Sequence, residues 1–272
     1  MFFKNFKVWE TEFAGRKLSV ETGKMAGLAN ASVMVRYGDT NVLCTVTASA
    51  KPREGVDFFP LSVDYEEKMY SVGRIPGSFQ RREGRASEKA ILTSRCIDRP
   101  IRPLFPKDLR NDCSVVATVM SVDPDCSPEI AAMIGVSTAI AISDIPWDGP
   151  ISGVNVGLVD GEIVLNPTLE QRAKTDLNLT VASTADLVAM IEAGGNEISD
   201  DLMFDCIMAG HEENKKIVKF IQGIVDEIGK PKFAYESSDP DPEIMKEIED
   251  FCIEDVKKAL DTDDKLVRDE AL

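Results

Sequence analysis

The chain reads GSFQRREGRASEKAILTSRCIDRPIRPLFP at residues 77–106, a basic stretch in an otherwise acidic protein. It lies within residues 74–110, where ten cations face four acids and the net charge is +6, although the whole chain carries −16. This contrast argues against a uniform basic coat and favours a focused anion site, with a phosphate-rich ligand as the natural candidate. We call these cations the basic belt: Arg74, Arg81, Arg82, Arg85, Lys89, Arg95, Arg99, Arg102, Lys107 and Arg110.

The centre of this stretch has the pattern of a helix. Ser87 can cap its first turn, and the proline-rich residues 99–106 are expected to end it. Four positions advance by four, three and four residues and therefore share one face of such a helix, namely 88, 92, 95 and 99.

Arg95 and Arg99 should therefore project together, and Arg102 joins them if the following turn folds back. Guanidinium groups that converge match the oxygens of a phosphate through charge-assisted, often bidentate hydrogen bonds. In the alternative, Glu88, Asp98 and loop carbonyls merely neutralise the arginines. Spacing alone leaves both interpretations open.

The glycine-punctuated residues 71–85 have no period and are expected to form an exposed loop. Phe79 lies there beside Arg81 and Arg82. An exposed Phe79 would stack on a nucleobase while the two arginines hold phosphates, which is the usual way to hold single-stranded RNA without reading its sequence. In the alternative, Phe79 fills a hydrophobic hollow and the arginines are solvated.

Length and composition predict one large α/β domain with a smaller appendage, because 272 residues with 43% hydrophobic content suffice for a real core. The first residues, MFFKNFKVWETEF, show neither a signal peptide nor a transit pattern, and no stretch approaches the roughly 18 uncharged apolar residues of a membrane span. We therefore expect a cytoplasmic protein without a membrane partner.

Metal and thiol chemistry have little support in the sequence. His211 is the single histidine, so a histidine pair and a multi-histidine metal site within one chain are excluded, and its place at the apparent polar start of a helical run favours capping or packing. Asp123 and Asp125 offer oxygen ligands for Mg²⁺, but two loop aspartates are more often turn formers. The cysteines lack ligand spacing and are expected to be reduced and mostly buried, namely Cys44, Cys96, Cys113, Cys126, Cys206 and Cys252.

The remaining chain alternates strand and helix signals. Strands are expected over residues 18–50, with a hairpin turn at Gly38-Asp39-Thr40, over 58–65 and 113–122, and over 153–167 as a hairpin with its turn at Asp160-Gly161. Residues 177–190 are expected to hold one more strand and the beginning of another element. Helices are expected from the Ser127 cap with Pro128 at the first position, and over Asp200–Gly229. No GxxxxGK[ST], GxSxG or GxGxxG motif supports a P-loop, hydrolase or dinucleotide site.

The last residues differ in composition from the rest. Residues 237–272 hold thirteen acids and five bases and carry a second apolar stripe at helical spacing. We expect a core over residues 1–236 and, over 237–272, the beginning of an all-helical domain that is truncated inside a helix bundle.

The strings GSFQRREGRASEKAILTSRCIDRPIRPLFP and SPEIAAMIGVSTAIAISDIPWDGPISGVNVGLVDGEIVLNPT closely resemble the first RNase PH-like core of the bacterial polynucleotide phosphorylase family. Residues 190–231 resemble that family's passage towards its all-helical domain. The resemblance implies an α/β (α+β) core with a mixed sheet and packed helices. It also implies a phosphorolytic 3′-to-5′ exoribonuclease of mRNA degradation, a nucleotidyltransferase that works as a homotrimeric ring on single-stranded RNA with inorganic phosphate as substrate and Mg²⁺ as cofactor.

When the family's motifs are matched to this sequence residue by residue, the resemblance places the family's pore-constricting RNA loop at Phe79, Gln80, Arg81 and Arg82. This loop usually reads Phe-Phe-Arg-Arg in the family, so Gln80 departs from the pattern. Arg85 follows this RNA-binding loop. Arg95 aligns with a phosphate-holding arginine of simpler RNase PH enzymes, and Arg99 and Arg102 align with first-core arginines that support RNA handling. In the family, the Mg²⁺ ligands and the main phosphate site belong to the second core, which this sequence lacks.

We therefore expect no catalytic residue and no metal ligand in this chain, and an inactive fragment of an active parent enzyme. A first alternative is a non-catalytic ring scaffold or partner-binding domain that does not contact RNA. A second is an autonomous RNase PH-type enzyme, for which acidic metal ligands and a serine-rich phosphate loop after the central helix are missing.

Overall fold

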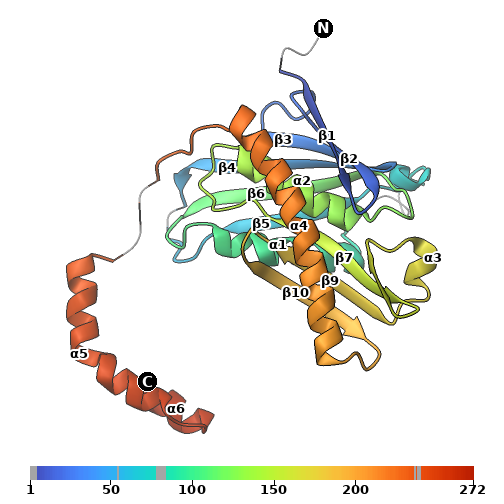
Figure 1. Cartoon of the computed structure of the whole chain (residues 1–272). Helices are drawn as coiled ribbons and strands as arrows, with labels where there is room; N and C mark the ends of the chain where they lie inside the picture. The colour runs from blue at the N-terminus through green and yellow to red at the C-terminus, as the bar shows by residue number, and fades with distance from the viewer. Residues whose placement is uncertain (1–4, 54, 78–83, 236, 238–239) are drawn as a thin grey trace. The chain divides into compact units, whose positions relative to one another are not determined.

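The computed structural model describes residues 5–53, 55–77, 84–235, 237 and 240–272. The chain divides into two compact units, Met1–Tyr235 and Glu236–Leu272. In the larger unit, the described strands form two sheets with helices packed between and against them (Figure 1). No helix in the described ranges is both long enough and apolar enough to cross a bilayer.

The first sheet orders its strands β1-β2-β3-β4-β6-β5. All neighbours pair antiparallel except β5, which runs parallel to β6, so the expected mixed sheet is confirmed. A strand at the beginning of the chain, β1, was not expected. The strands are β1 (Lys7–Phe13), β2 (Arg16–Thr22), β3 (Ala31–Tyr37), β4 (Thr40–Pro52), β5 (Leu61–Glu67) and β6 (Asn111–Ser121).

The turn between β3 and β4 confirms the first predicted hairpin. Gly38 has φ +56°, and a Cβ there would lie 2.6 Å from Cys126 Sγ and 2.8 Å from Asp123 Oδ2. Glycine is therefore required both by the backbone conformation and by the close approach of the segment before the central helix.

The second sheet is antiparallel with the order β10-β9-β7-β8. Asp160 and Gly161, at φ 52° and 82°, form the predicted turn between β7 and β8, where a two-residue type I′ hairpin needs two positive φ angles. The strands are β7 (Ser152–Val159), β8 (Glu162–Leu165), β9 (Leu177–Ser183) and β10 (Val188–Gly195).

Helix α2 (Pro128–Ile142) lies between the two sheets and is buried on every side. Its Gly135 faces Cys44 of β4, and its Met133 lies against Gly153 of β7. The small residues of this helix therefore allow close packing on both sides. Ser127 occupies the cap position, but its side chain does not accept a first-turn N–H as expected; it donates to Glu129 Oε2 at 2.5 Å.

Helix α4 (Asp200–Ile228) covers the other face of the second sheet, because its Gly210 approaches Val154, which alternates with Gly153 along β7 (Figure 1). The predicted stripe is largely confirmed, since Ile217, Ile221 and Ile224 are buried. The short helix α3 (Leu169–Arg172) precedes β9.

His211 does not lie at the polar start of a helix, as the sequence suggested. It lies near the middle of α4 and is buried, and its Nδ1 has no hydrogen-bond partner within the described residues. The position of His211 therefore supports a role in packing and not in capping, because the side chain does not reach a helix end.

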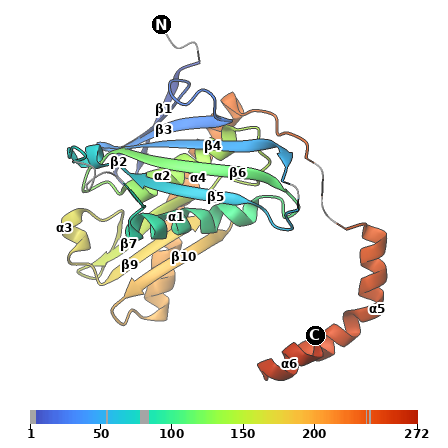
Figure 2. The ribbon, with the colours of Figure 1, turned by 180° about the vertical axis from the view of Figure 1, so that it is seen from behind.

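Helix α1 (Glu88–Ile101) packs beside β5 and also touches α2 and β10 (Figure 2). Ser87 caps it as predicted, since its hydroxyl accepts the N–H of Ala90 at 3.1 Å. The predicted end before Arg99 is wrong: the helix continues through the buried Pro100, and residues Arg102–Leu104 form the 3₁₀ turn η3. Trp147 Nε1 donates to the Ile101 carbonyl at 2.9 Å, so tertiary contacts stabilise the end that proline would otherwise weaken.

The second unit contains α5 (Pro242–Leu260) and α6 (Lys265–Ala271). Asp241 caps α5 by accepting the N–H of Glu243 at 2.9 Å. Ala259 is buried in this unit, whereas Ile248 and Phe251 are exposed. Residues of the predicted apolar stripe are therefore helical but only partly covered.

All six cysteines are described and free, and four are buried, which confirms the expectation of reduced, mostly buried thiols. Burial is the main cause that raises the pKa of Cys126 and of Cys96 to about 11. The Cys96 and Cys126 thiols are therefore protonated near neutral pH.

Candidate nucleic-acid interface

A cavity of about 550 Å³ lies between α1 and β5, and we call it the α1–β5 groove. Arg85, just before the helix, and Arg95, two turns into it, both line this groove. The spacing placed positions 88, 92, 95 and 99 on one face of the helix, and all four are exposed. The groove therefore brings together one residue of the predicted RNA loop region and one of the predicted phosphate site.

Arg85 and Arg95 are exposed, and neither has an ion pair or side-chain hydrogen bond within the described residues. Two guanidinium groups without a carboxylate partner remain free to donate charge-assisted hydrogen bonds to an anion. The groove is accordingly the described part of the basic belt that is best suited to bind phosphate groups.

The other two members of the predicted phosphate site are occupied by carboxylates. Arg99 Nη1 lies 3.4 Å from Glu192 Oε2 of β10. Arg102 donates to both oxygens of Asp98, at 2.9 and 2.7 Å, and to the Leu61 carbonyl at 3.1 Å. Arg99 and Arg102 each have a different protein acceptor in this structure, and their convergence with Arg95 on one anion stays a prediction.

Phe79, Gln80, Arg81 and Arg82 lie outside the described residues. The description resumes at Gly84, which lines the α1–β5 groove together with Arg85. The RNA-loop assignment of these four residues stays a prediction.

The opposite wall of the groove is acidic, which the sequence analysis did not anticipate. Asp64, Glu66 and Glu67 of β5 line it together with Lys68. The only sequence signal was the acid-rich string DYEEK at the end of a strand, which reads equally as a solvated edge.

Two of these acids are neutralised by lysines. Glu66 Oε2 lies 2.9 Å from Lys68 Nζ, and Glu67 Oε1 lies 3.6 Å from Lys89 Nζ. Asp64 is exposed and has no such partner in the described part of the chain. Along β5, Tyr65 and Glu67 are turned towards α1, whereas Asp64 shares the other face of the strand with Glu66, whose Oε2 accepts a hydrogen bond from Thr118 at 3.2 Å.

The first turn of α2 already holds an anion of its own. Glu129 accepts a hydrogen bond from Ser127 at 2.5 Å and pairs with Lys89 at 2.6 Å. Burial raises the pKa of Glu129, but the hydrogen bonds from Lys89 and Ser127 outweigh it and hold the pKa below its ordinary value. A helix N-terminus attracts anions, and at α2 the Glu129 carboxylate occupies that position.

Glu129 also borders a second cavity, of about 690 Å³, between α1, α2 and the second sheet. Arg172 lines this cavity, and its guanidinium donates to the Pro124 carbonyl. Glu88 and Glu192 contribute further negative charge. This mixture of charges, with Glu129 at the helix end, disfavours a phosphate ion there.

Asp123 and Asp125 act on the backbone. Asp123 accepts the N–H of Asp125 at 3.0 Å and that of Asp39 at 3.4 Å, and the first of these contacts is the main cause that lowers the pKa of Asp123. Asp125 accepts the N–H of Leu169 at 2.8 Å. Within the described ranges, no three acids, cysteines or histidines cluster as a metal site, so these residues do not fit the Mg²⁺ that the resemblance implies.

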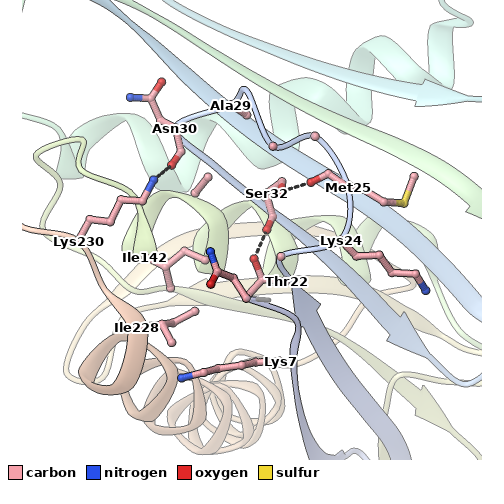
Figure 3. Close-up of a pocket in the computed structure, with 15 residues that line it drawn as sticks. Lys7, Thr22, Lys24, Met25, Ala29, Asn30, Ser32, Ile142, Ile228 and Lys230 are labelled. Atoms are coloured by element: carbon pink, nitrogen blue, oxygen red, sulfur yellow. Dashed lines mark hydrogen bonds between the residues drawn. The ribbon is translucent and has the colours of Figure 1, made fainter. Parts of the chain in front are cut away.

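Another cavity, of about 690 Å³, lies between residues 22–32 and the ends of α2 and α4 (Figure 3). Two of its three lysines bind protein oxygens: Lys230 donates to the Asn30 carbonyl at 2.5 Å, and Lys7 pairs with Glu227 at 2.8 Å. The third, Lys24, has its Nζ 5.6 Å from the centroid of the Phe6 ring. Ile142 and Ile228 line its interior. We therefore place the anion-binding surface at the α1–β5 groove instead.

Family models match most of the larger unit. The model described as 3′ exoribonuclease family, domain 1, matches residues 14–146, and that for domain 2 of the same family matches residues 149–213. The chain belongs to the 3′ exoribonuclease family. Domain 1 contains α1, α2 and nearly all of the first sheet, and therefore the whole α1–β5 groove, whereas domain 2 contains the second sheet.

Curated relatives extend the match over nearly the whole chain. The polyribonucleotide nucleotidyltransferase of Ruminiclostridium cellulolyticum is 60% identical over 97% of this chain and 38% of its own length. The enzyme of the same name from Clostridioides difficile is 56% identical over 96% of this chain and 37% of its own length. These matches confirm the resemblance that the motifs indicated, and this chain spans less than two fifths of the length of these relatives.

A solved structure supports the fold. The crystal structure of rice (Oryza sativa) Rrp46 superposes with a TM-score of 0.61 and 16% sequence identity, over 82% of this chain and 95% of that chain. The expected RNase PH-like architecture is thereby confirmed at the level of the fold.

Proposed function

We propose that this chain is the RNA-holding first core of a polyribonucleotide nucleotidyltransferase, a phosphate-dependent 3′-to-5′ exoribonuclease that takes part in mRNA degradation in the cytoplasm. The family match and the names of the relatives support the enzyme class. The observation that carries the role of this chain is the α1–β5 groove, where Arg85 and Arg95 have no carboxylate partner among the described residues. Guanidinium groups of this kind bind RNA phosphates.

In the complete enzyme, an oxygen of inorganic phosphate attacks the phosphorus of the last internucleotide linkage. The P–O3′ bond breaks, the shortened RNA keeps a 3′-hydroxyl, and the released nucleotide leaves as a nucleoside diphosphate. The same step in reverse extends RNA from nucleoside diphosphates. Mg²⁺ neutralises charge on the reacting phosphate groups when it is bound.

We assign this chain no catalytic residue. The Glu129 carboxylate holds the N-terminus of α2, where a substrate phosphate would otherwise find its donors, and it is fixed there by Lys89 at 2.6 Å and Ser127 at 2.5 Å. The phosphate site and the Mg²⁺ ligands belong to a second core that completes the enzyme, and three subunits form the ring around the RNA path.

Phe79, Arg81 and Arg82 supply the narrow RNA contact in this proposal, with Arg85 continuing the track into the α1–β5 groove. Gln80 replaces an aromatic residue of the family pattern. If that ring stacks on a base in relatives, its loss weakens stacking by roughly 1–3 kcal/mol. Binding by this core should therefore depend mainly on phosphate contacts and decline as salt rises.

The test measures binding of a fluorescent single-stranded oligo(A) by the wild type and by the Arg81→Ala/Arg82→Ala variant at several salt concentrations. We expect salt-sensitive binding by the wild type and clearly weaker binding by the variant. If both proteins bind alike, the loop assignment fails. If the wild type does not bind at all, the RNA-holding role fails.

A ring scaffold without RNA contact is the second candidate. The ion pairs Arg99–Glu192 and Arg102–Asp98 favour it, because they use two arginines of the basic belt to hold α1 against β10 and to fix the helix end. A scaffold would retain its assembly when Arg85 and Arg95 are removed and would show no RNA-dependent property.

A further inference from the structure

The chain that leaves α4 crosses the C-terminal end of α2 before it continues to the second unit. We call residues 229–235 the strap; they form neither helix nor strand, and both family matches end before them. Phe233 and Tyr235 of the strap are partly buried against the core, and the Tyr235 hydroxyl donates to the buried Asp108 Oδ1 at 2.8 Å. The strap is therefore attached to the core without belonging to one of its regular elements.

The strap supplies hydrogen-bond donors to the last carbonyl groups of α2. Such carbonyls have no partner within a helix, and burial makes an unsatisfied one costly. Lys232 Nζ donates to the carbonyls of Ser143 at 2.7 Å, Ala141 at 2.9 Å and Ile140 at 3.3 Å. One ammonium group therefore binds three carbonyl oxygens at the helix end, where the helix dipole also favours a cation.

The backbone of the strap adds two contacts at the same place. The N–H groups of Lys230 and Phe233 donate to the carbonyls of Ile142 at 3.1 Å and of Asp144 at 2.7 Å. The Lys230 ammonium group donates to the Asn30 carbonyl (Figure 3). These contacts hold the strap against the end of α2 and the loops beside it.

The strap can leave the core without disturbing a sheet or a helix. Most of its residues are exposed, and it contributes hydrogen bonds to α2 only beyond the last regular turn. Segments of this kind open locally at a lower free energy than the whole domain unfolds. Among the strap's printed side-chain contacts, Lys232 makes the most, so its loss should favour the open form most strongly.

We propose that the strap is a latch that sets the length of the tether to the second unit, with Lys232 as the residue that holds it closed. While the strap is closed, the tether begins after Tyr235. When the strap opens, the tether begins at Gly229, and the released residues add up to roughly 23–25 Å of reach, at about 3.3–3.6 Å for each extended residue. The inference goes beyond the proposed function and does not depend on RNA binding.

The test follows cleavage of the native full chain at Phe233 by chymotrypsin, since a protease needs an extended and released segment. Lys232→Met keeps an unbranched side chain and removes the ammonium group. Cleavage at Phe233 should accelerate about tenfold to hundredfold, as expected when hydrogen bonds of a charged group are lost. Lys219→Met is the matched control, because it removes an exposed lysine of α4 that has no ion pair or side-chain hydrogen bond within the described ranges, and it should match the wild type.

A second readout separates local opening from unfolding of the core. Phe13 is fully buried in β1, so its cleavage reports global unfolding. Urea below the unfolding transition should accelerate cleavage at Phe13 steeply and cleavage at Phe233 only slightly, because opening of the strap exposes little surface. Tyr235→Phe, which removes the hydroxyl that binds Asp108, should accelerate cleavage at Phe233 to a smaller extent than Lys232→Met does.

Small-angle X-ray scattering tests the reach itself. The maximum dimension should increase in the double variant Lys232→Met/Tyr235→Phe, which lacks both of these side-chain anchors, and should stay unchanged in Lys219→Met. An unchanged dimension in the double variant would show that the strap does not set the tether length.

The latch is also wrong if Lys232→Met is cleaved at Phe233 no faster than Lys219→Met, or if urea accelerates cleavage at Phe233 and Phe13 equally. Binding of oligo(A) by Lys232→Met should equal that of the wild type, because the helix α1 of the groove is tied to the opposite end of α2 through Lys89 and Glu129. A failure of RNA binding in the wild type would therefore remove the proposed function and leave the latch standing.

Discussion

Lys89 Nζ of α1 lies 2.6 Å from Glu129 Oε1 in the first turn of α2, and the same ammonium group lies 3.6 Å from Glu67 of β5. This ion pair joins the helix that carries Arg95 to the central helix of the fold. It also fills the N-terminus of α2 with a protein carboxylate, which supports our assignment of this core as non-catalytic.

Glu129→Gln should lower the free energy of unfolding at pH 7 by about 1–3 kcal/mol, because charge-assisted hydrogen bonds to Lys89 and Ser127 are lost. The pKa of Glu129 is lowered in the folded state, so its contribution is present above the unfolded pKa and is lost as the pH falls through the folded one. Urea unfolding should therefore show a smaller difference between wild type and variant at acidic pH. An equal difference at both pH values would contradict this account.

Gly135→Ala tests the close approach of α2 to the first sheet. A Cβ at this position would lie 2.5 Å from Cys44 Sγ and 2.9 Å from Val35 Cγ2. Crowding of this kind costs about 1–3 kcal/mol, which outweighs the gain of roughly 1 kcal/mol in helix propensity. We expect a net loss of stability in thermal unfolding, and a smaller loss when the change is made in a Cys44→Ala background. If Gly135→Ala leaves the stability of the wild-type background unchanged or raises it, the first sheet must move to make room for the added methyl group.

Ser94→Ala tests how α1 covers the edge strand β5. The Ser94 hydroxyl accepts the N–H of Tyr65 at 3.0 Å and donates to the Ala90 carbonyl at 3.0 Å. Its loss leaves the Tyr65 N–H without a partner and should cost about 1–2 kcal/mol. Hydrogen exchange of the Tyr65 amide should accelerate in the variant more than that of the Val115 amide in the sheet interior. Unchanged exchange at Tyr65 would mean that another acceptor protects it.

Features that depend on neighbouring residues could be predicted from the sequence. Gly38 and Asp160-Gly161 mark turns whose backbone conformations few residues adopt, and Ser87 caps a helix through an N–H only three residues away. The helical spacing also placed Arg95 and Arg99 on one face of α1, where both are exposed. These predictions needed no information about the tertiary structure.

Features that depend on residues far away in the chain could not be predicted from the sequence. The partner of Arg99 is Glu192, 93 residues away, and nothing near Arg99 indicates it. The end of α1 depends on Trp147, which supports a helix that Pro100 should have ended. Strand β1 was missed because its residues are mostly exposed and polar, so it lacks the apolar pattern of a buried strand.

The same limit applies to the candidate site. The arginines of the basic belt were visible as a charge cluster, but the acidic wall that faces them comes from β5, which precedes the belt in the chain. Only the Asp98 partner of Arg102 was visible beforehand, because it lies one turn earlier on the same helix.

This chain should show no phosphorolysis by itself. Incubation with oligo(A), inorganic phosphate and Mg²⁺ should release no ADP above background, because the Glu129 carboxylate holds the α2 N-terminus. A full-length relative serves as the positive control. Robust release of ADP by this chain would show that the first core is catalytic and would favour an autonomous RNase PH-type enzyme.

The salt dependence of RNA binding by Arg85→Ala/Arg95→Ala tests the central claim most directly, with Arg36→Ala/Arg53→Ala as a control that removes the same charge elsewhere. The slope of the logarithm of the binding constant against the logarithm of salt concentration should shrink by about 1.4 in the groove variant, at roughly 0.7 per phosphate contact with a single strand, and should stay unchanged in the control. Equal slopes for wild type and groove variant would contradict the account.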